Sequence, residues 1–220
     1  MILFYAPLSC SFVARVVANE AEISLEYEQV DVFSKKLPGR DGSYLDTSPL
    51  GLVPLLRLPD GTLLSELLAI SLYLAEQKTE TGLVPPHGTA DYYQVLSWHS
   101  LVGMELHKKI LWTLANPGPS RAAKEFAASC APAVLDHFER HLGSREYLVG
   151  ERFTIADAYL AWALTLAPML GVQLGDRPAL AQYTKRIQQR PSARDAMKIE
   201  LPLAREATER QRHLLSNVAY

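Results

Sequence analysis

A cysteine lies near the start of the chain, where an apolar segment gives way to helical spacing. Residues 1–6 read Met-Ile-Leu-Phe-Tyr-Ala, a run that favours a short buried strand, and Pro7 ends it. Apolar residues then recur at helical spacing at Phe12, Val13, Val16 and Val17. We therefore expect the Cys10 thiol at a helix N-terminus, where unpaired amides and the helix dipole favour a thiolate and the binding of an anionic or thiol-bearing ligand.

Two other interpretations of this segment remain open. Cys10 also fits a small buried apolar residue with no chemistry of its own. Ser9 and Ser11 flank the thiol, and in a serine-type enzyme one of them would carry the role given to Cys10.

Further titratable residues have both a chemical and a structural interpretation. His107, inside a predicted long helix, titrates near physiological pH, but a helical histidine is more often a packing or surface residue. Glu66 opens a predicted helix, where the dipole alone favours a carboxylate. Glu105 is spaced to pair with Lys108 or Lys109 along its helix.

The first 80 residues must position Cys10 and Glu66, and they alternate between strand and helix signals. Asp60-Gly61 lies between two apolar runs and predicts a β-hairpin. Ser65 is expected to be the N-cap of the helix that follows. Pro54 precedes the hairpin, and the sequence alone favours a trans bond there. The predicted order is β-α-β-(α)-β-β-α, with a helix over 11–21, a strand over 25–32, a short helix around Tyr44 and Leu45, hairpin strands at 55–58 and 63–64, and a helix over 66–77.

After a Gly- and Pro-rich linker over 79–89, every signal is helical. A long helix is predicted over 91–115, and Ser120 is expected to cap a helix that extends to Leu142. Thr154 and Asp157 form a capping-box variant that opens an apolar helix through Leu170. Pro178 is placed to open another helix, and breaks are expected at Arg190-Pro191-Ser192 and at Leu201-Pro202. We expect two domains, residues 1–80 and 88–220.

Composition narrows the classes of function. The 220 residues are 48% hydrophobic and 21% charged, with a formal net charge of -2, which indicates a globular protein and no nucleic-acid partner. Two cysteines fit a reducing compartment rather than a disulfide scaffold. No secretory signal and no membrane span are evident, so a cytoplasmic protein is expected, and no metal site is predicted.

Several motifs in register resemble the glutathione transferases, most closely the bacterial beta class. They cover about residues 1–200, and the tail after Leu201 is longer than is usual for the class. The motifs are Phe4-Tyr5-Ala6-Pro7 with Cys10-Ser11, Ser48-Pro49-Leu50-Gly51-Leu52-Val53-Pro54, Asp60-Gly61-Thr62-Leu63-Leu64-Ser65-Glu66, Glu105-Leu106-His107-Lys108, and Phe153-Thr154-Ile155-Ala156-Asp157-Ala158-Tyr159-Leu160.

The resemblance implies an α/β thioredoxin-like N-terminal domain that binds glutathione, followed by an all-α domain that carries the electrophile pocket. It implies a homodimeric, cytoplasmic detoxification enzyme that conjugates glutathione, its co-substrate, to small hydrophobic electrophiles, with glutathione-dependent disulfide reduction as a further reaction. In the family the proline matching Pro54 is cis, which lets the Val53 backbone pair with glutathione.

The resemblance also implies roles for individual residues. Cys10 and His107 would be catalytic, with Cys10 beside the glutathione sulfur and His107 bonding or deprotonating the thiol. Lys35, a better match in spacing than Lys36, would bind the glycine carboxylate, and Glu105 would reach the neighbouring subunit's ligand. The glutathione site as a whole would comprise Cys10, Lys35, Leu52, Val53, Glu66, Leu67, Ser100, Met104, Glu105 and His107.

Some positions depart from the family pattern. Leu67 stands where the family usually has Gly or Ser, so a backbone contact to glutathione is preserved but a side-chain hydroxyl contact is not. Ser100 stands where the family often has Asn, and Leu50 where the class often has Lys. A zeta-like glutathione-dependent isomerase is an alternative, although Leu8-Ser9-Cys10-Ser11 matches its Ser-Ser-Cys motif only in part. A non-catalytic binding protein of the same fold, with an inert Cys10, is another.

Overall fold

The computed structural model describes residues 1–218, and it describes side chains for residues 1–209. The chain divides into two compact units. One comprises Met1–Leu74 together with the chain from Pro191 onward, and the other comprises Ala75–Arg190. We refer to them as the sheet unit and the helical unit.

The sheet unit is built on four strands in the order β2-β1-β3-β4. β1 and β2 are parallel, and α1 connects them, whereas β1–β3 and β3–β4 are antiparallel. A core cluster of Phe4, Val30, Tyr44 and Leu55 packs on this sheet. The elements are β1 (Ile2–Tyr5), α1 (Ser11–Glu20), β2 (Glu26–Gln29), η1 (Tyr44–Asp46), β3 (Leu55–Arg57) and β4 (Leu63–Ser65).

The predicted hairpin, first helix and short Tyr44 helix are confirmed, but the start of the next helix is not as predicted. Ser65, expected as an N-cap, is the last residue of β4 and pairs with Leu55. Glu66 takes the position before α2 (Leu67–Glu76), with a left-handed φ of 69°. The pairing of Ser65 in the sheet decides this, because a residue in a strand ladder cannot also turn into the helix.

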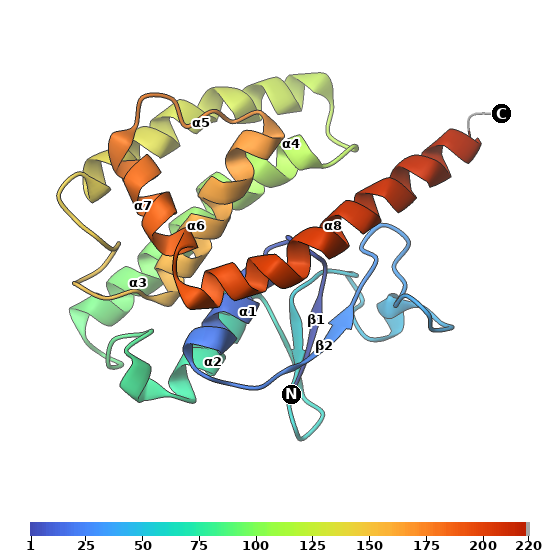
Figure 1. The fold of residues 1–220 in the computed structure, drawn as a ribbon, viewed down its shortest axis with the longest axis horizontal. Helices are drawn as coiled ribbons and strands as arrows, with labels where there is room; N and C mark the ends of the chain where they lie inside the picture. The colour runs from blue at the N-terminus through green and yellow to red at the C-terminus, as the bar shows by residue number, and fades with distance from the viewer. Residues whose placement is uncertain (219–220) are drawn as a thin grey trace. The chain divides into compact units, whose positions relative to one another are not determined.

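A long helix, α8 (Pro191–Val218), contacts α1 within the sheet unit (Figure 1). The expected break at Leu201-Pro202 is wrong, since Pro202 lies inside this helix. Proline removes one backbone donor from a helix. Here packing on α1 outweighs that local cost, as tertiary contacts commonly do for helices.

The helical unit contains antiparallel and crossing helices, which Figure 1 labels α3 to α7. Predicted caps are confirmed: Ser120 Oγ accepts the amide of Ala123, Thr154 and Asp157 form the capping box, and Pro178 opens α7. The elements are η2 (Thr79–Thr81), α3 (Ala90–Leu101), η3 (Val102–Trp112), α4 (Thr113–Ala115), α5 (Arg121–Leu142), α6 (Ile155–Leu166), η4 (Ala167–Leu170) and α7 (Pro178–Gln188).

Two helices differ in geometry from the prediction. The helix expected over 91–115 is continuous, but its central segment η3 is a π-helix. π-Helical segments are rare and frequently occur at functional sites. The apolar helix expected through Leu170 ends at Leu166, and a 3₁₀ turn follows with Pro168 near its start, because proline cannot donate the backbone bond that continues an α-helix.

The architecture predicted from the sequence, a small sheet domain followed by a helical domain, is confirmed. The domain boundaries of 1–80 and 88–220 stay a prediction, because compact units need not coincide with folding domains. Within the described chain, no helix combines the length and the apolar character needed to cross a membrane.

Candidate functional site

Strand register gathers several predicted site residues at one end of the sheet. Phe4 near the end of β1 pairs with Leu55 at the start of β3, and Leu55 pairs with Ser65 at the end of β4. Cys10 lies in the segment after β1, Val53 in the segment before β3, and Glu66 directly after β4, so all three residues lie at this end of the sheet. The end of β2 lies at the same end, since Tyr5 pairs with Gln29, and the segment carrying Lys35 follows it.

Cys10 occupies the N-cap position of α1, as predicted, and is partly buried. Its Sγ lies 3.5 Å from the carbonyl oxygen of Val53, to which the thiol is placed to donate. The first-turn amides are less available to an anion than expected. Ser11 N–H donates to Ser9 Oγ at 3.3 Å, Phe12 N–H to Ser9 O at 2.9 Å, and Val13 N–H to Cys10 O at 3.1 Å. The helix dipole still favours negative charge at this end of α1.

Ser11 has a structural role in this turn. It is fully buried, its Oγ donates to Ala6 O at 3.1 Å, and it accepts from Ala6 N–H at 3.2 Å. Ser9 Oγ lies 2.7 Å from Ser11 Oγ. A hydroxyl committed to these partners ties the end of β1 to α1, and this favours Cys10 over Ser11 as the reactive group.

A buried carboxylate from α8 also holds this turn, and the sequence analysis missed it. Glu200, with no exposed surface, accepts from Leu8 N–H at 2.8 Å and from Arg15 Nε at 2.7 Å. The Arg15 guanidinium lies over the Tyr27 ring, 3.6 Å from its centroid. Burial raises the pKa of Glu200, while the Leu8 amide and Arg15 oppose that rise. The contact joins positions 192 residues apart, so no local pattern signals it.

The segment before β3 presents backbone groups next to Cys10. The Val53–Pro54 bond is cis, as the family resemblance implied and as the sequence alone did not favour. Leu52 O accepts from Tyr44 Oη at 2.9 Å, which anchors the segment to η1. Lys35 Nζ donates to Gly51 O at 3.0 Å. Of the two candidate lysines, Lys35 therefore contacts this segment through its side chain.

Glu66 and Leu67 form the start of α2. Glu66 is exposed, and its carbonyl accepts from Ile70 N–H at 3.0 Å, while Leu67 is buried. The left-handed backbone of Glu66 is uncommon for a residue with a side chain and is found most often where structure serves a function.

In the helical unit, the predicted site residues differ in exposure. Ser100 is exposed, and Met104 is 63% exposed, which is unusual for so apolar a side chain. Glu105 pairs with Lys109, with 2.8 Å between Lys109 Nζ and Glu105 Oε2. One of the two ion pairs along the helix that the sequence suggested is therefore present. The Glu105 carboxylate remains partly exposed.

His107 is 7% exposed and lies among aromatic side chains of α6. Its Nδ1 is 2.6 Å from Tyr159 Oη, and the Trp162 ring stands edge-on to it, with centroids 4.8 Å apart. Burial lowers the pKa of His107 to about 3, and a smaller lowering comes from the charge of Lys108. His99, whose ring also packs against Tyr159, is 2% exposed, and burial lowers its pKa to about 4. Both imidazoles are therefore neutral at pH 7.

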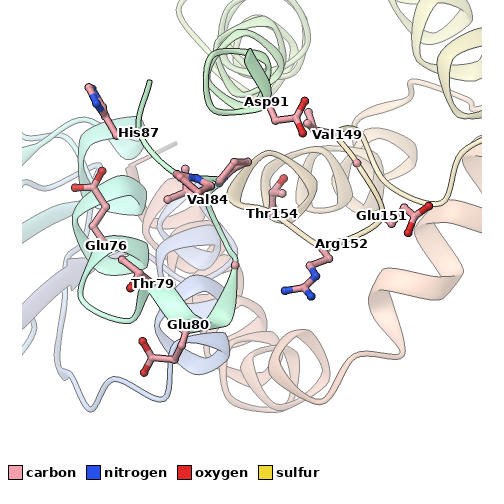
Figure 2. A pocket seen from close by; sticks show the side chains of 14 residues that line it. Glu76, Thr79, Glu80, Val84, His87, Asp91, Val149, Glu151, Arg152 and Thr154 are labelled. Atoms are coloured by element: carbon pink, nitrogen blue, oxygen red, sulfur yellow. The ribbon is translucent and has the colours of Figure 1, made fainter. Parts of the chain in front are cut away.

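A separate cavity of about 800 Å³ lies within the helical unit (Figure 2). Glu76, Thr79 and Glu80 line one side of it, and Arg152 and Thr154 line the other. None of the predicted site residues lines this cavity. Among the described residues, no group of three or more His, Cys, Asp or Glu side chains is arranged to hold a metal ion.

Both parts of the chain match known protein families. Residues 9–77 match the family described as "Glutathione S-transferase, N-terminal domain", and residues 104–191 match "Glutathione S-transferase, C-terminal domain". The chain is 32% identical over 200 residues to "Glutathione S-transferase GstA" of Escherichia coli O157:H7, which covers 91% of this chain and 98% of that protein.

Solved structures agree with this likeness. A sphingomonad glutathione S-transferase complexed with glutathione is 34% identical, with a TM-score of 0.85, over 91% of this chain and 98% of that one. The bacterial beta class enzyme of Sphingomonas chungbukensis is 34% identical, with a TM-score of 0.86 and the same coverage.

A further relative is known by its sequence. A maleylacetoacetate isomerase of Rhizobium meliloti (strain 1021) is 30% identical over 187 residues, 81% of this chain and 86% of that protein.

Proposed function

From the premise that this chain belongs to the glutathione S-transferase family, we propose that it binds glutathione at the end of the sheet marked by Cys10, Val53 and Glu66. The single observation that carries this assignment is the strand register. It aligns Phe4, Leu55 and Ser65 in one row. The segments that follow β1, precede β3 and follow β4 therefore lie at the same end of the sheet.

The groups available there suit a tripeptide with a thiol and charged ends. The Val53 backbone, which follows the hydrogen-bonded Leu52 carbonyl, offers strand-like pairing to the cysteinyl part of glutathione. Glu66 would hold the γ-glutamyl ammonium and the Leu67 amide its carboxylate. Lys35, which already contacts Gly51, would pair with the glycine carboxylate. The family resemblance assigns Ser100, Met104, Glu105 and His107 of the helical unit to the same ligand.

Conjugation needs little covalent chemistry from the protein, because glutathione supplies the nucleophile. The glutathione thiol loses its proton to solvent, and the thiolate attacks an electrophilic carbon. A carbon–sulfur bond forms, and the leaving group, a halide in an aryl halide, departs with its bonding pair. The enzyme contributes by orienting the sulfur and by favouring the thiolate.

Cys10 suits a second reaction of the same site, thiol–disulfide exchange. Its thiolate attacks the glutathione sulfur of a mixed disulfide, forms a disulfide between Cys10 and glutathione, and releases the other thiol. A second glutathione thiolate then attacks this disulfide, restores Cys10 and leaves as oxidised glutathione. This cycle begins from Cys10 as a free thiol, the form that the structure describes.

The likeness to a maleylacetoacetate isomerase supports a glutathione-dependent cis–trans isomerisation as a second candidate. Addition of the thiolate to the double bond, rotation and elimination would regenerate glutathione without net consumption. Assay of a maleyl ring-cleavage product separates the two, because only conjugation consumes glutathione.

We place the chain in the bacterial beta class and propose a cytoplasmic homodimer that detoxifies small hydrophobic electrophiles. The likeness to a beta class enzyme and the cysteine at the junction of β1 and α1 support the class. A content of two cysteines is typical of proteins of a reducing compartment.

The test combines calorimetry with two activity assays. Glutathione should bind the wild-type protein with measurable heat, and conjugation of an activated aryl halide and reduction of a glutathione mixed disulfide should both be detectable. Cys10→Ala should lose disulfide reduction by roughly 100-fold or more while conjugation falls less, because the nucleophile of conjugation is glutathione itself.

Cys130→Ala is the matched control, since Cys130 lies in α5 of the helical unit and is also partly buried. It should behave as the wild type in all three measurements. A wild-type protein that shows neither binding heat nor either activity would overturn the proposed function.

A further inference from the structure

His107 and Tyr159 meet inside the helical unit, where η3 and α6 pack together. His107 Nδ1 and Tyr159 Oη are 2.6 Å apart, and the two side chains are 7% and 4% exposed. Gly103, one helical turn before His107, lies beside the tyrosine: a Cβ at this position would be in ordinary van der Waals contact with it, 3.5 Å from Tyr159 Oη. The imidazole is thus oriented by a hydrogen bond as well as by the Trp162 ring.

The protonation state of His107 determines what the ring offers. Burial keeps it neutral at pH 7 by lowering its pKa to about 3. A neutral imidazole carries its single hydrogen on Nδ1 or on Nε2, and the partner of one nitrogen selects between them. Tyr159 and Trp162 contact the ring, and Lys108 lies beside it on the helix. The hydrogen bonds and ion pairs of the described residues join no carboxylate to His107 that would stabilise an imidazolium.

The length of the contact favours the tyrosine as donor. Protein N–H···O bonds span about 2.7–3.2 Å, whereas O–H···O bonds are shorter, about 2.5–3.0 Å. A separation of 2.6 Å therefore fits a tyrosine hydroxyl that donates to Nδ1. Basicity favours the same direction, since an unprotonated imidazole nitrogen accepts a proton with a pKa of about 6.5 in water, whereas a phenol oxygen is a far weaker base.

We propose that Tyr159 is a positioning residue that holds His107 in the tautomer with hydrogen on Nε2, so that His107 donates a hydrogen bond to the glutathione sulfur instead of acting as a base. The idea rests on the proposed function, which assigns His107 to that sulfur. Among the described side chains, Nε2 has no hydrogen-bond partner, so its N–H is available to a ligand. A donated hydrogen bond stabilises the thiolate over the thiol and favours ionisation of bound glutathione.

The tautomer is measured directly on the ligand-free protein labelled with ¹⁵N-histidine. Long-range ¹H–¹⁵N correlation spectra distinguish a protonated from an unprotonated ring nitrogen, and the spectrum of His107→Gln assigns the signal among the six histidines. We expect Nε2 protonated and Nδ1 unprotonated at pH 7. A wild-type spectrum with the hydrogen on Nδ1 would overturn the proposal, whether or not the protein binds glutathione.

Tyr159→Phe removes the hydroxyl and keeps the ring. In this variant the Nδ1-protonated form of His107 should become populated. The acid limb of the pH profile of kcat/KM for the electrophile, measured at saturating glutathione, should move up by about one pH unit. Below the pKa of the bound thiol, this shift lowers kcat/KM by roughly tenfold. Glutathione affinity at high pH should change little, because the ring still packs.

Tyr183→Phe is the matched control. Tyr183 is also buried in the helical unit, but its hydroxyl donates to Asp157 Oδ1 at 2.9 Å. The control should lose stability without altering the His107 tautomer or the pH profile. If Tyr159→Phe leaves both the tautomer and the profile unchanged, the proposal fails. Absence of glutathione binding by the wild type would instead refute the proposed function, while the tautomer measurement still stands on its own.

Discussion

At the scale of single residues, folding lowers the pKa values of two buried histidines, His99 and His107. His99 is 2% exposed, and its Nε2 is one of the few buried polar atoms for which the described part of the structure provides no hydrogen-bond partner. Its ring packs against Tyr159, with centroids 4.7 Å apart. Such a site excludes the charged imidazolium, so protonation of His99 is coupled to unfolding.

Replacement of His99 by leucine should therefore reduce the loss of stability in acid. The folded protein has a His99 pKa of about 4, against an ordinary value of 6.5. Between these values the unfolded chain binds a proton that the folded chain does not, so stability falls as pH falls from 6.5 towards 4. His99→Leu removes this contribution, which amounts to about 1.4 kcal/mol per pH unit.

Urea unfolding gives the free energy of unfolding at pH 6.5 and at pH 4.5. Between these two pH values it should fall less in His99→Leu than in the wild type. His87→Leu serves as the control, because His87 belongs to the same unit but is exposed. Equal pH dependence in the wild type and His99→Leu would show that His99 titrates alike in both states.

At the scale of elements, one carboxylate links α8 to the turn between β1 and α1. Glu200 accepts hydrogen bonds from the Leu8 amide and from Arg15, and both charged side chains are almost fully buried. Leu8 has a left-handed φ of 57°, so its conformation depends on this support. The last helix thus takes part in shaping the loop that presents Cys10.

Glu200→Gln should destabilise the protein by about 3–5 kcal/mol, because it leaves the Arg15 charge buried without a counter-charge. The free energy of unfolding in urea measures the loss, and the reactivity of Cys10 with a thiol reagent should rise as the turn loosens. Glu28→Gln is the comparison, since Glu28 pairs with the exposed Arg40. That change should cost less than about 1 kcal/mol, and equal costs for the two variants would contradict a supporting role for Glu200.

At the scale of the whole molecule, the proposed assembly is a homodimer. Large apolar side chains of the helical unit are exposed in the single chain, among them Tyr93 at 55%, Met104 at 63% and Phe126 at 63%. Exposed apolar groups of this size often mark surfaces that bind another protein.

Light scattering coupled to gel filtration should give a mass of twice 24.4 kDa. Phe126→Asp should shift the mass towards that of one chain at low concentration, because a charge at an apolar interface weakens association. Cys130→Ala, on the same helix, should leave the mass unchanged. A wild-type mass of one chain at every concentration used in the activity assays would exclude the dimer.

Local signals explain why much of this protein was predictable. The Asp60-Gly61 turn, the Ser120 cap and the capping box of Thr154 with Asp157 each depend on residues within a few positions of one another, and each is confirmed. The placement of Cys10 at the start of α1 is of the same kind. Strand pairing overrode one predicted cap, since Ser65 pairs within β4 and Glu66, with a left-handed φ, precedes α2.

By itself, the sequence determined the order of elements, the helix caps, the position of Cys10 and the likeness to a transferase family. Only the tertiary structure decided that Glu200 would hold Leu8, that Tyr159 would bond His107, and that α8 would continue past Pro202. The physical reason is range: caps and turns depend on neighbours in the chain, whereas a buried hydrogen bond between residues 52 or 192 positions apart exists only after packing has brought them together.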